Sequence, residues 1–191
     1  MPALLTTRLR LMPMSLDVVE ALLRRDREGT ERAVDTLLAT TATTDECARH
    51  GAELPDDWPS DQLIARAFPY SLDAIRADPD TRLWGDSLIV PRTGPARIVG
   101  SVIFHGRPAS GIAEVGYGVA EDSRGQGLAT EATLACVEWA LTQPGITAVH
   151  AVTFPWHVAS LGVIRKLGMT EVGKREHDVL GELRVFERRR G

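Results

Sequence analysis

The stretch that decides the fold is residues 116–132, GYGVAEDSRGQGLATEA. Its opening has the pattern of a strand that ends at Val119, and a short polar loop follows. Gly125 and Gly127 then lead directly into an amphipathic helix expected over 125–143. The apolar residues of this helix recur at helical spacing: Leu128, Ala132, Cys136 and Ala140.

The glycine turn before this helix predicts an anion site. Glycine has no Cβ, so the backbone can approach a ligand closely. The first N–H groups of a helix have no partners within the helix, and the helix dipole adds positive charge there, which suits a phosphate or pyrophosphate. The turn is not a P-loop, because no Gly-Lys-Ser/Thr follows, and residues 125–130 lack the third small residue of a dinucleotide fingerprint. A glycine-rich helix start without any ligand is the alternative that these residues leave open.

The charge of the chain bears on how an anionic ligand could be bound. The chain has 191 residues, 43% of them hydrophobic, which suits one domain with a sizeable core. With 22 basic and 26 acidic residues the net charge is −4, so no global attraction to nucleic acid or to an anionic membrane is expected. Any anionic ligand must therefore be held by a local site.

Cysteine usage and the N-terminus point to the cytoplasm. The two cysteines, Cys47 and Cys136, are far apart and lack metal-ligand spacing, which favours free thiols in a reducing compartment and no metal site. The first residues do not have the pattern of a signal peptide. No apolar run approaches the ~18 residues that a membrane helix needs.

The remaining pattern predicts helices in the first half and alternating strands and helices in the second. In the second half this order implies parallel strand pairing through right-handed crossovers. The expected strands are 6–14, 83–91, 97–105, 112–119, 146–154, 169–177 and 182–188, and the further helices are a segment after Ser15, 31–40, 60–77 with a break at Pro69, and 158–167, with a loop over 41–60.

The residues then resemble a known family. Residues 124–129, RGQGLA, match the R/Q-x-x-G-x-G/A pyrophosphate motif of the GNAT N-acetyltransferases, and the similarity extends to EVGYGV at 114–119, to Ser160 and to KLGM at 166–169. The chain looks most like the branch that contains the Rim-type ribosomal-protein N-terminal acetyltransferases. The resemblance implies an α/β acyltransferase fold with a V-shaped mixed sheet. It implies one domain over 1–191, with an acyl-CoA-binding core at 83–191 and a helical elaboration at 15–80 on the acceptor side.

The resemblance also implies acetyl-CoA as co-substrate. Its thioester would lie where the strand ending at Val119 splays from its neighbour, and the Val119 N–H would bind the thioester carbonyl oxygen. Arg124 would either add a charge-assisted contact or face solvent. His157 stands where the family usually has asparagine and is expected to contact CoA. The backbone N–H groups expected on the pyrophosphate are those of Gly125, Gln126, Gly127, Leu128 and Ala129.

The implied reaction is direct attack of a primary amine on acetyl-CoA without a covalent enzyme intermediate. A lysine-like amine is mostly protonated at pH 7, so a base is needed. Glu114 is the candidate base, directly or through water; a solvent-facing strand glutamate is the alternative. Ser160 would protonate or hydrogen-bond the departing thiolate, unless it only satisfies the start of its own helix.

The acceptor is left open among a protein N-terminus, an amino sugar and a small metabolite. Gly118 stands where the family usually has tryptophan, which leaves space next to Tyr117. The tryptophans Trp58, Trp84 and Trp156 either line the acceptor cleft or belong to the core. A non-catalytic acyl-CoA-binding sensor or assembly module, and a transferase for a longer acyl-CoA, are the rival functions. A homodimer is also left open.

Overall fold

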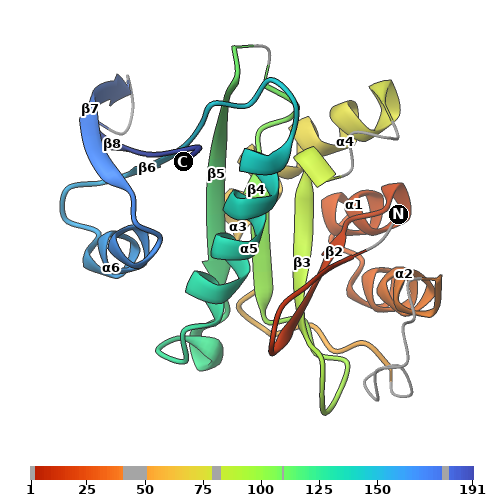
Figure 1. Cartoon of the computed structure of the whole chain (residues 1–191). Helices are drawn as coiled ribbons and strands as arrows, with labels where there is room; N and C mark the ends of the chain where they lie inside the picture. Colours follow the sequence, from red (N-terminus) through yellow and green to blue (C-terminus); the bar gives the residue numbers. More distant parts are fainter. Residues whose placement is uncertain (1–2, 41–50, 79–82, 109, 178–180) are drawn as a thin grey trace.

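A mixed β-sheet forms the centre of the protein (Figure 1). The computed structural model describes residues 3–40, 51–78, 83–108, 110–177 and 181–191. Within these residues the sheet has eight strands in the order β1-β2-β3-β4-β5-β6-β8-β7. The strands are β1 (Leu4–Leu5), β2 (Leu9–Pro13), β3 (Asp86–Pro91), β4 (Gly100–Phe104), β5 (Ile112–Val119), β6 (Ala148–Thr153), β7 (Thr170–His177) and β8 (Gly181–Arg189).

Strand β5 changes partner halfway along its length. Ile112 to Glu114 pair in parallel with β6, whereas Val115 to Val119 pair antiparallel with β4. Beyond Glu114, β6 therefore leaves the side of β5, and the sheet opens there. The mixed sheet that the sequence predicted is confirmed.

The sequence predicted two connections between parallel strands, β5–α5–β6 and β6–α6–β7, and in the described residues only one of them joins a parallel pair. The connection β5–α5–β6 does so, but β8 lies between β6 and β7 and is antiparallel to both. The prediction of parallel pairing after β6 is therefore wrong. After α6 the chain forms β7 at the edge of the sheet, and the last strand, β8, then lies between β7 and β6.

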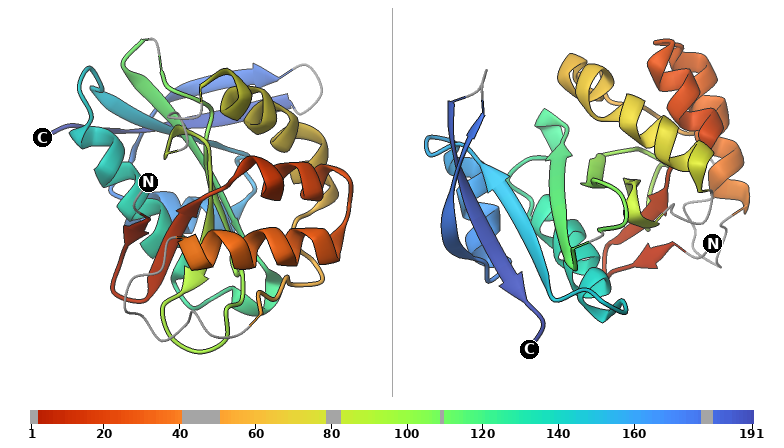
Figure 2. Two further views of the ribbon diagram at one scale, coloured as in Figure 1. Left: turned by 90° about the vertical axis from the view of Figure 1, so that its right-hand side faces the viewer. Right: turned by 90° about the horizontal axis from the view of Figure 1, so that it is seen from above.

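Helices cover both faces of the sheet (Figure 2). On one face lie α5 (Leu128–Thr142) and α6 (Val158–Lys166), and on the other α1 (Leu16–Leu23), α2 (Arg27–Thr40), α3 (Asp61–Arg66) and α4 (Phe68–Ala77). Because side chains alternate along a strand, Leu9 and Leu11 of β2 pack toward α5, whereas Met12 packs toward α1 and α2. No helix in the described part of the chain has the length and apolarity needed to cross a membrane.

Several element boundaries differ from the expectation. The helix expected from 31 begins at Arg27, and the one expected over 60–77 is divided into α3 and α4, with Pro69 in the first turn of α4. In the expected loop, residues 41–50 lie outside the described residues, and Glu53 forms an isolated bridge with Arg97.

The tryptophans have different environments. Trp58 and Trp84 are each 5% exposed, so both belong to the core rather than to a cleft. The Trp84 ring lies 4.6 Å from that of Trp139 and 5.4 Å from that of Phe104. Trp156, in contrast, is 71% exposed.

The described cysteine is part of the core, whereas Cys47 lies outside the described residues. Cys136 is free and buried on α5. Burial raises the pKa of the Cys136 thiol to about 12, so it stays protonated and unreactive at neutral pH.

Candidate active site

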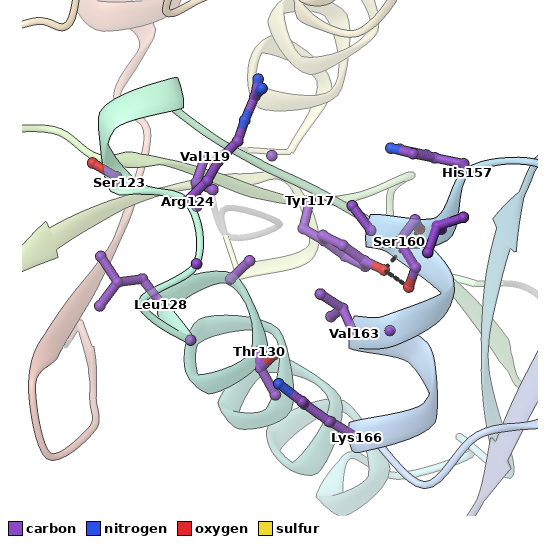
Figure 3. A pocket seen from close by; sticks show the side chains of 17 residues that line it. Tyr117, Val119, Ser123, Arg124, Leu128, Thr130, His157, Ser160, Val163 and Lys166 are labelled. Atoms are coloured by element: carbon purple, nitrogen blue, oxygen red, sulfur yellow. Dashed lines mark hydrogen bonds between the residues drawn. The ribbon is translucent and has the colours of Figure 1, made fainter.

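A cavity of about 530 Å³ lies where β6 diverges from β5 (Figure 3). Its wall comes from the end of β5, the turn before α5, the first turn of α5 and one side of α6 along its length. The lining residues are Tyr117, Gly118, Val119, Ser123, Arg124, Gly125, Gly127, Leu128, Ala129, Thr130, His157, Val158, Ala159, Ser160, Gly162, Val163 and Lys166.

The glycine turn leaves the start of α5 open toward this cavity. The helix begins at Leu128 rather than at 125, because Gly125 and Gly127 have φ values of 73° and 78°, which favour glycine and end the turn in a left-handed conformation. Gly127 is the N-cap and has no side chain to occupy the first N–H groups of α5. These donors and the helix dipole are therefore available to an anion.

Residues of the N-terminal strand region hold this turn from outside. The Arg8 guanidinium donates to the carbonyl oxygen of Gln126 at 3.0 Å and to the carboxylate of Glu131 at 2.6 Å. Thr6 also donates to Glu131, at 2.6 Å. Burial raises the pKa of Glu131, but the hydrogen bonds from Thr6 and Arg8 outweigh it and hold that pKa below its ordinary value. Sequence reasoning missed this clamp, because the two segments are far apart in the chain.

Tyr117 and Ser160 meet across the cavity. The Tyr117 hydroxyl lies 3.1 Å from the carbonyl oxygen of Ser160 and 3.0 Å from its Oγ (Figure 3). Burial raises the pKa of Tyr117, against a smaller opposite effect of the Ser160 hydrogen bond, so the phenol stays neutral and able to donate. Ser160 is the third residue of α6, whose N-cap is His157. The Ser160 hydroxyl therefore contacts Tyr117 from within the helix rather than capping it.

Two further predicted residues lie at the cavity with other partners. The Arg124 guanidinium forms an ion pair with Glu121 at 3.1 Å, and both side chains are exposed. The His157 Nδ1 is 3.4 Å from Thr153 Oγ1. Both residues still line the cavity, so each is within reach of a ligand there.

Gln126 and Glu114 are not among the lining residues. The Gln126 amide donates back to the Asp122 carbonyl oxygen at 3.0 Å. Glu114 lies on β5, where its Oε2 accepts from Arg175 at 3.0 Å and its Oε1 is 4.0 Å from His105 Nε2. Its neighbours Ala113 and Val115 pack toward α5, so alternation directs Glu114 to the opposite face of the sheet.

No group of three or more metal-ligating side chains occurs among the described residues.

The divided sheet, the uncapped start of α5 and the cavity between them are features of an acyltransferase that uses an acyl-CoA donor. Residues 8–170 match the family model described as an acetyltransferase (GNAT) domain, so the chain belongs to the GNAT acetyltransferase family. It is accordingly an acetyl-CoA-dependent acyltransferase, as the sequence predicted.

Similar proteins agree with this assignment. The chain is 24% identical over 164 residues to the uncharacterized N-acetyltransferase YjdG of Bacillus subtilis (strain 168), covering 85% of this chain and 86% of that protein. A GnaT-family acetyltransferase from Bordetella pertussis has the same fold, with a TM-score of 0.64, 19% identity and coverage of 98% and 99%. The ribosomal L7/L12 alpha-N-protein acetyltransferase RimL, solved in complex with coenzyme A, gives a TM-score of 0.60 at 16% identity, with coverage of 96% and 95%.

Proposed function

We propose that this enzyme transfers the acetyl group of acetyl-CoA to a primary amine, either a protein N-terminus or a small-molecule amine, by direct nucleophilic attack. The observation that supports this most is the orientation of the β5 backbone at the cavity. Ala120 N donates to Val99 O at 2.9 Å, and Gly100 is the partner of Val119 in the ladder. In an antiparallel ladder alternate residues bond the partner, so the Val119 N–H points away from β4, to the side that β6 has left.

In the proposed complex the thioester lies in this opening. The Val119 N–H donates to the thioester carbonyl oxygen and stabilises the negative charge that develops on it during attack. The N–H groups of the segment from Gly125 to Ala129, including that of Gln126, bind the pyrophosphate. Arg124 adds a charge-assisted contact by exchanging Glu121 for the phosphate. His157 contacts the pantetheine arm.

The proposed chemistry combines the exchange of a C–S bond for a C–N bond with proton transfers at the amine and at the thiol. The neutral amine attacks the carbonyl carbon and forms the C–N bond, the C–S bond breaks, and the thiolate accepts a proton or hydrogen bond from Ser160. The nitrogen gives up its surplus proton to water, and water restores the Ser160 hydroxyl where it has donated its proton. The proton that the acceptor's ammonium group loses before the attack passes to Glu114, directly or through water. The Arg175 guanidinium orients Glu114 for this role by holding one of its two carboxylate oxygens.

The acceptor side of the proposed single domain, 1–191, is the sheet face opposite α5. In the left view of Figure 2, α4 and the β7–β8 pair both lie on the side of β5 that is turned away from α5. We propose that the helical block at 15–80 helps to select the acceptor, while the core at 83–191 binds the donor. RimL, by its name, acetylates a ribosomal protein, which makes a protein N-terminus one of the acceptor classes to test. The cytoplasm remains the proposed compartment, since the free thiol of Cys136 suits a reducing environment.

A thiol-release assay with acetyl-CoA tests this function. The acceptor panel contains N-terminal peptides, amino sugars and small amines, and mass spectrometry identifies the acetylated product. Turnover with at least one amine is expected, and CoA binding without turnover on any of them would instead support the sensor alternative. Faster turnover with a longer acyl-CoA would support the alternative donor. Glu114→Gln is expected to lower kcat, and full kcat across the pH range would refute its role as base.

A further inference from the structure

Four ionisable side chains form a row across the sheet face opposite α5. The ladder registers place Glu114 of β5 beside His150 of β6, and His150 beside Glu187 of β8. His105 follows β4, and its backbone N–H donates to the Glu114 carbonyl oxygen at 3.4 Å. The chain neighbours of these residues that pack toward α5 are Phe104, Ala113, Val115, Val149, Ala151 and Phe186. Alternation therefore directs all four ionisable side chains to the other face.

The row alternates between imidazoles and carboxylates. His150 Nε2 lies 3.0 Å from Glu187 Oε2, and these side chains are only 18% and 9% exposed. At the other end, His105 Nε2 lies 4.0 Å from Glu114 Oε1 and is 58% exposed. Among the described residues two guanidiniums contact the row: that of Arg175 pairs with Glu114, and that of Arg189 has its Nε 2.6 Å from Glu187.

Glu187 determines which nitrogen of His150 can accept a proton. An ionised carboxylate only accepts hydrogen bonds, so the Nε2 of His150 carries the hydrogen and its Nδ1 keeps a free lone pair. The hydrogen bonds from Arg189 and His150 hold the pKa of Glu187 below its ordinary value, which keeps it ionised. Glu114 and His150 are partners in the parallel β5–β6 ladder, so their side chains are neighbours on this face. One water between the two side chains can then carry a proton from Glu114 to Nδ1.

We propose that His150, oriented by Glu187, receives the acceptor's proton from Glu114 during acetyl transfer. This inference rests on the proposed function. The ammonium group of the acceptor loses one proton to the Glu114 carboxylate, which passes it to His150 Nδ1. The resulting imidazolium is neutralised by Glu187 until the proton leaves to solvent. Imidazole is a stronger base than a carboxylate, so this transfer returns Glu114 to its ionised form before the next turnover.

The decisive variant is His150→Gln. Glutamine can still donate a hydrogen bond to Glu187, but it cannot take up a proton. General-base assistance contributes about 10²–10⁴-fold to a rate, and because Glu114 still accepts the first proton we expect a loss of kcat at the low end, about 10²-fold at pH 7. The loss should shrink as the pH rises, since more of the amine is then already neutral. Glu187→Gln should lower kcat in the same pH-dependent way.

The controls separate this role from a structural one. The exposed His177, at the end of β7, gives the matched variant His177→Gln, which should keep the wild-type kcat. The Kd for CoA should be unchanged in all three variants, because CoA binds on the other side of β5. A His150→Gln enzyme with wild-type kcat, or with a loss that is equal at every pH, would overturn the inference while leaving the proposed function intact. No turnover by the wild-type enzyme on any amine would overturn the proposed function, and this inference with it.

Discussion

Asp86 should make the protein less stable as the pH rises from acidic to neutral. The residue begins β3 and is only 2% exposed. Its Oδ2 accepts a hydrogen bond from Ser71 of α4, whereas its Oδ1 is buried without a hydrogen-bond partner in the described structure. Burial raises the pKa of Asp86 from 3.8 to about 6, against a smaller opposite effect of the Ser71 hydrogen bond. The fold therefore prefers the protonated form.

The sign and size of the effect follow from this shift. Between pH 3.8 and about 6 the folded protein holds a proton that the unfolded chain has released, so the free energy of unfolding falls as the pH rises. The contribution of Asp86 is fully present below the unfolded pKa and is lost as the pH rises through the folded pKa. The change of the Asp86 pKa from 3.8 to about 6 corresponds to about 3 kcal/mol of unfolding free energy.

The test is Asp86→Asn, which keeps the shape and can still accept from Ser71 but cannot ionise. Urea unfolding at pH 4.0 and at pH 7.5 gives the difference in unfolding free energy between variant and wild type. Because pH 4.0 lies just above the unfolded pKa, this difference should shift in favour of the variant by about 2.5 kcal/mol between the two pH values. Comparing differences cancels the other titrating groups. Asp73→Asn, an exposed position on α4, is the matched control and should show no such shift. A difference for Asp86→Asn that is the same at both pH values would refute the reasoning.

Three further changes test the site and the core. Tyr117→Phe removes the hydroxyl that holds Ser160. The loss of this hydrogen bond, about 1 kcal/mol, should lower kcat severalfold and leave the KM for acetyl-CoA unchanged. Tyr70→Phe, at an exposed position, is the control, and equal kcat in both variants would contradict the role of Tyr117. Gly127→Ala places a Cβ on a residue with φ 78°, which costs about 1–2 kcal/mol in the turn. The Kd for CoA, measured by calorimetry, should therefore rise about tenfold. An unchanged Kd would show that the turn is not part of the binding site. Trp84→Ala should lower the free energy of unfolding by about 3–5 kcal/mol in urea, whereas a loss below about 1 kcal/mol would mean that this ring is not packed in the core.

The features that could be predicted from the sequence are the local ones. The strand that ends at Val119, the glycine turn and the apolar row of α5 each depend on neighbouring residues, and all three are where the pattern indicated. The start of α5 was misplaced by three residues, since Gly125 and Gly127 could belong either to a first helical turn or to a left-handed turn. Only their positive φ values decide between these.

The features that sequence reasoning missed depend on register between distant strands. Nothing in the local pattern places His150 beside Glu114, or Glu187 beside His150, because pairing is set by how the whole sheet assembles. The contact between Tyr117 of β5 and Ser160 of helix α6 joins segments that are far apart in the chain, and no local pattern brings them together. The burial of Trp84 depends on its contacts with Trp139 of α5, which no neighbouring residue indicates.

Strand β5 explains how one short segment can serve both substrates of the proposed reaction. Its odd-numbered residues direct Tyr117 and Val119 toward the face of α5, and the same residues point their N–H groups into the opening beside β6. Its even-numbered residues direct Glu114 to the opposite face, where Gly118 adds no side chain and has no atom within 4 Å of the position of a Cβ. Donor and acceptor can therefore approach the opening from opposite faces. Because the side-chain period of a strand is two, a slip of one residue would exchange these faces. In the observed register Gly100 of β4 is the partner of Val119 of β5, and a Cβ on Gly100 would collide with the Gly118 carbonyl oxygen, so this register fits glycine at position 100.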